Sequence, residues 1–86
     1  MKIADIREAI STHIEAAEYK KALKFCELMV NHHSLELCFD DWFQKGLCHF
    51  MLDQYDDSVS CYERALAIEP SNFQAMSNIA IILLRL

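Results

Sequence analysis

The stretch from Trp42 to Pro70 constrains the fold of this chain more than any other part. It alternates large and small residues at fixed offsets within a sequence that otherwise favours helix. The residues in this pattern are Trp42, Gly46, Tyr55, Ser58, Tyr62, Ala65 and Pro70. Small residues let two helices approach closely, and large residues fill the remaining space between them. The stretch therefore predicts a hairpin of two helices, with a turn at Asp53 and Gln54 and an end at Pro70.

The whole chain is poor in residues that interrupt helices, and its one glycine and one proline both lie in this stretch. Only one glycine and one proline occur among 86 residues, and 53% of the residues are hydrophobic. This composition predicts one small all-helical domain. We expect helices over residues 3–16, 19–31, 39–52 and 56–68 and from Ser71 to the end, with a connector over 32–37. Ser71 and Gln74 are spaced as a capping box for the last helix.

The predicted helices also repeat one another. Moving the first helical pair onto the second by 36 positions, and the third helix onto the fifth by 34, aligns residues of similar type. The aligned pairs include Tyr19/Tyr55, Ala22/Ser58, His13/His49, Phe39/Phe73, Trp42/Met76 and Gly46/Ala80. The repetition favours an array of helical hairpins. A small five-helix bundle without a repeat is the alternative.

Residues 39–72 resemble one tetratricopeptide repeat, a 34-residue helix–turn–helix unit. Its signature positions carry Trp42, Gly46, Ser58, Tyr62, Ala65 and Pro70. Lys45 and His49 depart from the usual pattern, because a leucine and an aromatic residue are common there. The resemblance implies an all-α, right-handed α-helical solenoid of antiparallel hairpins with five helices. Residues 1–86 would form a single domain of about two and a half repeats, with units at about 3–36 and 39–72 and a half unit at 73–86.

The same resemblance implies a non-catalytic protein-binding function. In this family the first helix of each unit lines a concave groove that holds a peptide or a partner helix. Transferred onto this sequence, the groove is apolar, with Phe43, Leu47, Phe50, Met51, Ile81 and Leu84. Charged residues that would orient the partner are Arg7, Asp40 and Arg85. Such a groove suits a protein or peptide with an apolar helical face. In a bundle, the same apolar residues would simply be buried core.

Two further functions fit the resemblance. One is a dedicated chaperone for a hydrophobic helical subunit, similar to the small type III secretion chaperones with tetratricopeptide folds. The other is a self-assembling repeat unit. Residues 73–86 carry apolar side chains around almost the whole helix, and each large one left in water forgoes about 1.5–3 kcal/mol of burial. We therefore expect a second copy, giving a homodimer through 73–86, or a hydrophobic partner or further sequence to cover this helix.

Other classes of function are disfavoured. The net charge of -5 argues against nucleic acid, and no apolar run is long enough to cross a membrane. Four cysteines without framework spacing suggest reduced thiols in the cytoplasm, with Cys26, Cys48 and Cys61 acting as small hydrophobic residues. The histidines and cysteines lack the spacing of metal ligands, and there is no glycine-rich phosphate loop. We expect no metal, no cofactor and no enzymatic activity.

Overall fold

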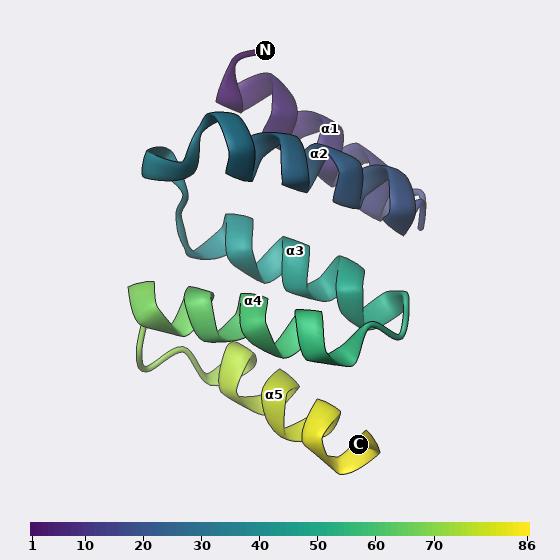
Figure 1. The fold of residues 1–86 in the computed structure, drawn as a ribbon, viewed down its shortest axis with the longest axis vertical. Helices are drawn as coiled ribbons and strands as arrows, with labels where there is room; N and C mark the ends of the chain where they lie inside the picture. Colours follow the sequence, from purple (N-terminus) through teal and green to yellow (C-terminus); the bar gives the residue numbers. More distant parts are fainter.

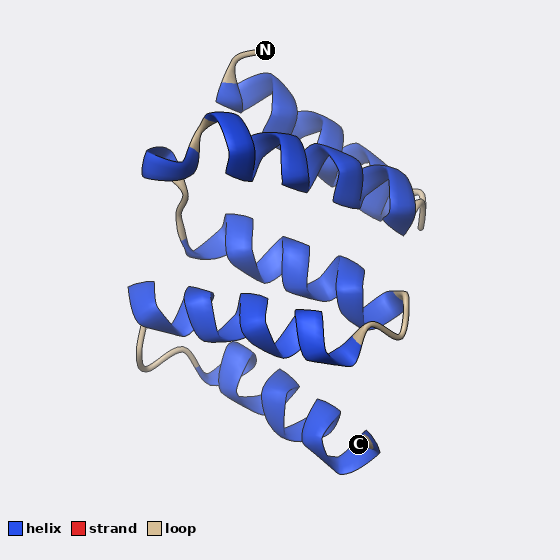
Figure 2. Cartoon of the chain, viewed as in Figure 1, coloured by secondary structure: helices blue, strands red, loops and turns tan.

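The computed structural model describes all 86 residues and contains five α-helices and no strand (Figures 1 and 2). The helices are α1 (Ile3–Glu15), α2 (Tyr19–His32), α3 (Phe39–Met51), α4 (Tyr55–Ile68) and α5 (Phe73–Arg85). A short 3-10 turn, η1 (Ser34–Glu36), lies in the connector between α2 and α3. The predicted all-helical fold with five helices is confirmed, and each helix end lies within two residues of the predicted one.

Each helix packs mainly against the helices next to it in sequence. The contacts join α1 with α2, α2 with α3, α3 with α4 and α4 with α5, so the chain zigzags down a stack (Figure 1). The stack is elongated, with extents of 37 × 25 × 19 Å. Packing between sequence neighbours is typical of a helical solenoid, whereas in a bundle helices distant in sequence would also meet. The repeat interpretation of the sequence is therefore the correct one.

The turns within the two hairpins have the same construction, 36 positions apart. Ala17 and Asp53 are the only residues other than glycine with positive φ, at 57° and 59°. In each turn a histidine Nδ1 contacts the side chain five residues later: His13 with Glu18 Oε1 at 3.0 Å, and His49 with Gln54 Oε1 at 2.7 Å. Because these details match, the first and second hairpins are structural repeats even though their sequences match only in part.

The α3–α4 hairpin closes most tightly at Gly46. Ser58 Oγ donates a hydrogen bond of 2.7 Å to the Gly46 carbonyl oxygen. A Cβ atom at Gly46 would lie 2.9 Å from Cε1 of the buried Tyr62 ring, which is closer than side chains normally approach. The predicted role of the small residues, to let the paired helices touch, is confirmed.

The predicted start of the last helix is wrong by one residue. Asn72, not Ser71, is the N-cap of α5, and its Oδ1 accepts a 3.1 Å hydrogen bond from the backbone N–H three residues later. Gln74 closes no capping box. Asparagine caps helices as well as serine does, so the capping preference of the two residues could not decide between them.

Two groups of buried side chains hold the stack together. One joins α1 and α2 through Ile6, Ile10, Cys26 and Met29, and the other joins α3, α4 and α5 through Phe39, Ala65 and Ala75. Cys48 and Cys61 are buried as well, so three of the four free cysteines serve as small core residues, as predicted. No helix combines the length and the apolar character that crossing a bilayer requires.

Candidate functional site

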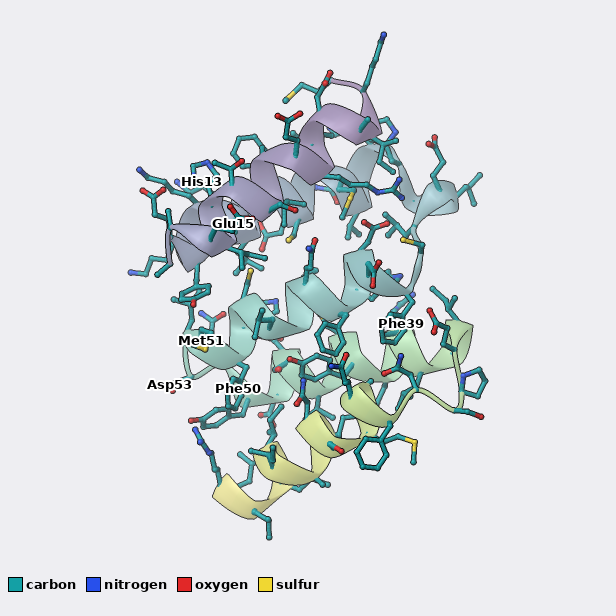
Figure 3. The ribbon with its side chains drawn as sticks, turned by 180° about the vertical axis from the view of Figure 1, so that it is seen from behind. His13, Glu15, Phe39, Phe50, Met51 and Asp53 are labelled. Atoms are coloured by element: carbon teal, nitrogen blue, oxygen red, sulfur yellow. The ribbon has the colours of Figure 1, made fainter.

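A small hollow of about 100 Å³ lies where α3, α4 and α5 meet. Its walls are mostly apolar, and they are formed by Leu47, Phe50, Tyr62, Asn78 and Ile81. Helices α1, α3 and α5 face the viewer in Figure 3, where Phe50 and Met51 mark the end of α3 near the hollow. Three of the nine predicted groove residues, Leu47, Phe50 and Ile81, are thus brought together from two helices.

The Tyr62 hydroxyl is the one buried side-chain polar atom without a hydrogen-bond partner. Burial raises the pKa of Tyr62, and the neighbouring side chains of Asn78 and Ser58 offset this only in part. A buried hydroxyl without a partner is costly unless another polar group reaches it. The hollow is therefore apolar in its walls but carries polar groups, Tyr62 and Asn78, that can fix the orientation of what enters.

Arg85 gives the edge of the hollow a positive charge. Its guanidinium carbon lies 5.0 Å from the centroid of the Phe50 ring, and no carboxylate pairs with it. Met51 and Leu84, the other predicted apolar groove residues nearby, are exposed. The edge thus combines one unpaired cation with exposed apolar side chains.

Phe43 takes part in packing as well as facing the groove side. Its ring centroid lies 5.5 Å from that of Phe39 and 5.2 Å from that of Tyr62, and Phe43 packs against the α3–α4–α5 core while remaining half-buried. Much of the Phe43 side chain is therefore part of the core, which was the alternative role expected for the apolar groove residues. Phe43 supports the wall behind Tyr62, and its contact with a partner stays a prediction.

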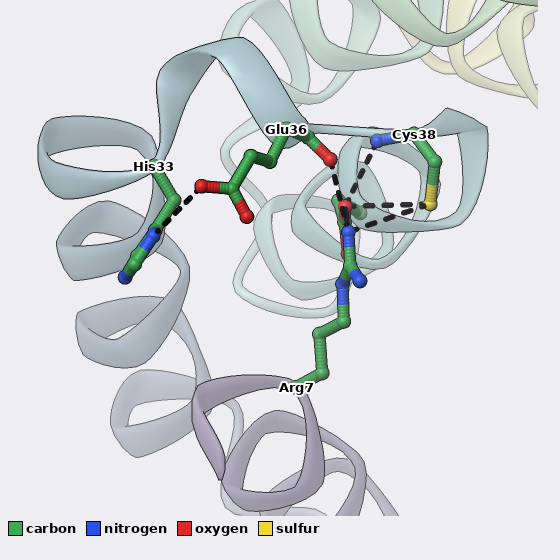
Figure 4. Close-up of polar contacts among 5 residues, drawn as sticks. Arg7, His33, Glu36 and Cys38 are labelled. Atoms are coloured by element: carbon green, nitrogen blue, oxygen red, sulfur yellow. Dashed lines mark hydrogen bonds and ion pairs between the residues drawn. The ribbon is translucent and has the colours of Figure 1, made fainter. Parts of the chain in front are cut away.

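Arg7 and Asp40 lie away from the hollow, and Arg7 is already paired within the chain. The Arg7 guanidinium donates to both carboxylate oxygens of Asp41, at 3.0 and 2.8 Å, and to the Glu36 carbonyl oxygen at 3.1 Å (Figure 4). The Cys38 backbone N–H donates to the same carboxylate at 2.9 Å, which completes a capping box at the start of α3. Arg7 therefore links the two repeats, and the exposed Asp40 makes no hydrogen bond through its side chain.

The pKa of Asp41 reflects this network. Burial by itself would raise the pKa, but the hydrogen bonds from Arg7 and from the Cys38 backbone outweigh it and hold the pKa below its ordinary range. The Arg7 pKa is raised, chiefly by its hydrogen bond to Asp41. Both shifts mean that the ion pair is fully formed at neutral pH, so Arg7 has little free charge to offer a partner.

Three residues of these sites were not singled out from the sequence as site residues. The sequence pattern predicts for Tyr62 only a packing role between helices, and it predicts no binding or bridging role for Asn78 and Asp41. Asn78 could have been found, because it lies three residues before Ile81 and so shares its helix face. The pairing of Asp41 with Arg7 could not, because the two lie 34 positions apart and nothing in either local pattern connects them. No group of three histidine, cysteine or acidic side chains is placed to hold a metal ion.

Comparison with known proteins agrees with this architecture. The sequence profile of the family described as "Tetratricopeptide repeat" matches residues 39–72, the same residues as the predicted middle unit. Over 44 residues the chain is 32% identical to "Tetratricopeptide repeat-containing protein trd-1" of Caenorhabditis elegans. That alignment covers 51% of this chain and 6% of the relative, so the chain spans only a small part of that protein. No solved structure gives a significant match.

Proposed function

We propose that this chain, whose residues 39–72 match the tetratricopeptide repeat family, is a non-catalytic interaction module whose concave face binds an apolar helix or peptide. The tetratricopeptide repeat is itself a protein-interaction unit. The observation that carries the finer proposal is the hollow between Leu47, Phe50 and Ile81, because it is shaped by side chains of two successive repeats and opens next to exposed apolar residues.

In this proposal one apolar side chain of the partner fills the hollow. Its volume of about 100 Å³ suits a branched or unbranched aliphatic side chain such as leucine or methionine. Burying such a side chain supplies about 1.5–3 kcal/mol, and neighbouring apolar residues of the partner would lie on the exposed Met51 and Leu84. A polar atom of the partner would reach the Tyr62 hydroxyl or Asn78, and a carboxylate would meet Arg85.

A dedicated chaperone for a hydrophobic helical subunit would use the same contact and remains an alternative within this proposal. The cytoplasm is the proposed location, because a reducing compartment keeps four free cysteines as thiols. The predicted role of Phe43, Arg7 and Asp40 in contacting the partner is also kept as part of the proposal. Their effect would be smaller, because Phe43 is largely packed and Arg7 is paired.

The proposal is tested with a phage-displayed library of helical peptides, whose best binders are remade and measured by fluorescence anisotropy. Ile81→Asp places a charge at the hollow on a half-exposed residue, so the fold should survive. We expect affinity to fall at least tenfold, with a smaller loss for Leu47→Ser. Leu83→Asp is the matched control, because Leu83 is on the same helix and exposed but does not line the hollow. Equal effects of Ile81→Asp and Leu83→Asp would contradict the groove.

A further inference from the structure

Two polar side chains line the hollow between α3, α4 and α5 without a hydrogen bond between them. The Tyr62 hydroxyl is buried and has no partner, and the half-buried Asn78 makes no side-chain hydrogen bond within the chain. Burial raises the pKa of Tyr62, and the nearby Asn78 lowers it only in part. Ser58, the other polar neighbour of this hydroxyl, donates its own hydrogen to the Gly46 carbonyl. Two polar groups at one hollow are therefore left for a ligand.

The Tyr62 hydroxyl lies on the side of the hollow. A long side chain on a helix leans toward the N-terminal end of that helix, so Tyr62 leans toward the first turns of α4. The Phe50 ring is at that end, because its centroid lies 5.9 Å from the ring of Tyr55, the first residue of α4. Phe50 and Asn78 both line the hollow. The hydroxyl and the Asn78 amide therefore form one polar end of a hollow whose other walls are apolar.

This side of the stack stays open within an array of repeats. The place that corresponds to the hollow one repeat earlier lies between α1, α2 and α3, and α4 follows it in the chain. Four residues there remain partly exposed although α4 is present: Ser11, Ile14, Gln44 and Leu47. A next helix packed as α4 is packed would leave the hollow open in the same way. The polar pair is particular to the hollow, because Cys26 stands at the earlier place where the hollow has Tyr62.

The two polar groups fit a primary amide. The Tyr62 hydroxyl can donate to the amide oxygen, and the Asn78 amide both donates and accepts, so two amides pair in either orientation. A carboxylate could only accept, and it would bring a charge between apolar walls that include no cation. In a partner helix the backbone amides bond to one another, so the primary amide must come from a side chain.

We propose that the hollow selects a glutamine side chain of the partner helix. This inference rests on the proposed function, because it names the residue that the groove takes into the hollow. Glutamine has the length of methionine, so its two methylene groups fill the apolar part between Leu47, Phe50 and Ile81, and its amide reaches Tyr62 and Asn78. Asparagine has one methylene group fewer and would leave part of the volume of about 100 Å³ empty.

The probe is the tightest-binding peptide from the helical library, measured by fluorescence anisotropy on the intact chain. Alanine replacements along the peptide are compared on the wild type and on Ile81→Asp. The peptide residue whose loss matters on the wild type but not on Ile81→Asp is the one that enters the hollow. Versions with glutamine, methionine, leucine and glutamate at that position are then compared. We expect glutamine to bind about tenfold more tightly than methionine, because it adds hydrogen bonds to two groups that otherwise lack partners.

Variants of the protein assign the preference to the polar end of the hollow. Tyr62→Phe should abolish most of the preference for glutamine over methionine without lowering the unfolding midpoint. Tyr55→Phe is the matched control and should keep the preference, because the Tyr55 hydroxyl bonds to Asp53 at 3.0 Å and does not line the hollow.

The outcomes separate this inference from the proposed function. Equal binding of the glutamine and methionine versions, a preference that persists in Tyr62→Phe, or tightest binding of the glutamate version overturns the inference while the groove stands. If Ile81→Asp weakens none of the peptides, the groove itself is wrong and the inference falls with it.

Discussion

The link between Arg7 and Asp41 should carry a measurable share of the stability of this small stack. Arg7→Met keeps an unbranched apolar side chain in place of the aliphatic part of arginine but removes two charge-assisted hydrogen bonds to Asp41 and one to the Glu36 carbonyl. Asp41, only 3% exposed, would keep its bonds from Cys38 but lose its cation. Bonds to charged groups contribute about 1.5–3 kcal/mol, and Arg7 is 39% exposed, so water screens part of the loss. We expect a destabilisation of about 2 kcal/mol.

Urea unfolding followed by circular dichroism measures this change. A double-mutant cycle with Asp41→Asn should give a coupling of about 1–2 kcal/mol, while Lys20→Met, on an exposed lysine without a partner, should change little. Because folding lowers the Asp41 pKa, the contribution of the pair is complete above the ordinary carboxyl pKa of about 3.9 and is lost as pH falls below it. Arg7→Met should therefore flatten stability against pH in that range. A loss under about 0.5 kcal/mol with no coupling would refute this reasoning.

Three further predictions concern packing. Tyr62→Phe removes a buried hydroxyl without a partner and should raise the free energy of unfolding by about 1 kcal/mol; a loss of that size in urea would contradict it. Gly46→Ala should lower the thermal midpoint, because overlap with the Tyr62 ring costs about 1–3 kcal/mol and only the lowest value in this range would be offset by the gain of about 1 kcal/mol in helix propensity; a raised midpoint would show that the ring moves aside. Ile10→Ala should cost about 3 kcal/mol in urea, while Leu35→Ala, at a fully exposed residue, should cost almost nothing; similar losses would refute the burial pattern.

The fold could be predicted because its determinants repeat along the sequence. Gly46 and Ser58 indicate a close helix pair by their size, and Pro70 ends it by its geometry. The sequence does not decide which of two chemically similar neighbours takes a given structural position. Ser71 and Asn72 are both good caps, and only the path of the chain after Pro70 places Asn72 at the first turn of α5.

The lining of the hollow was predictable where residues share one helix face, and side-chain contacts across helices were not. Leu47 and Ile81 could be named from their repeat positions, and the structure places both in the hollow. The sequence predicts that Arg7 is free to contact a partner, but its guanidinium is paired with the carboxylate of Asp41, 34 positions away. This ion pair depends on how the first hairpin stacks on the second. The spacing of residues within one helix gives no information about that stacking.

Partner binding at the hollow of the concave face can be observed directly on the residues that line it. The most direct measurement is methyl NMR of the labelled chain as a library-selected helical peptide is added. We expect the largest shifts at Leu47 and Ile81. We also expect Ile81→Asp to weaken peptide binding at least tenfold and Leu83→Asp to leave it unchanged. Shifts confined to α2 and to the outer side of α4, with binding unchanged in Ile81→Asp, would contradict it.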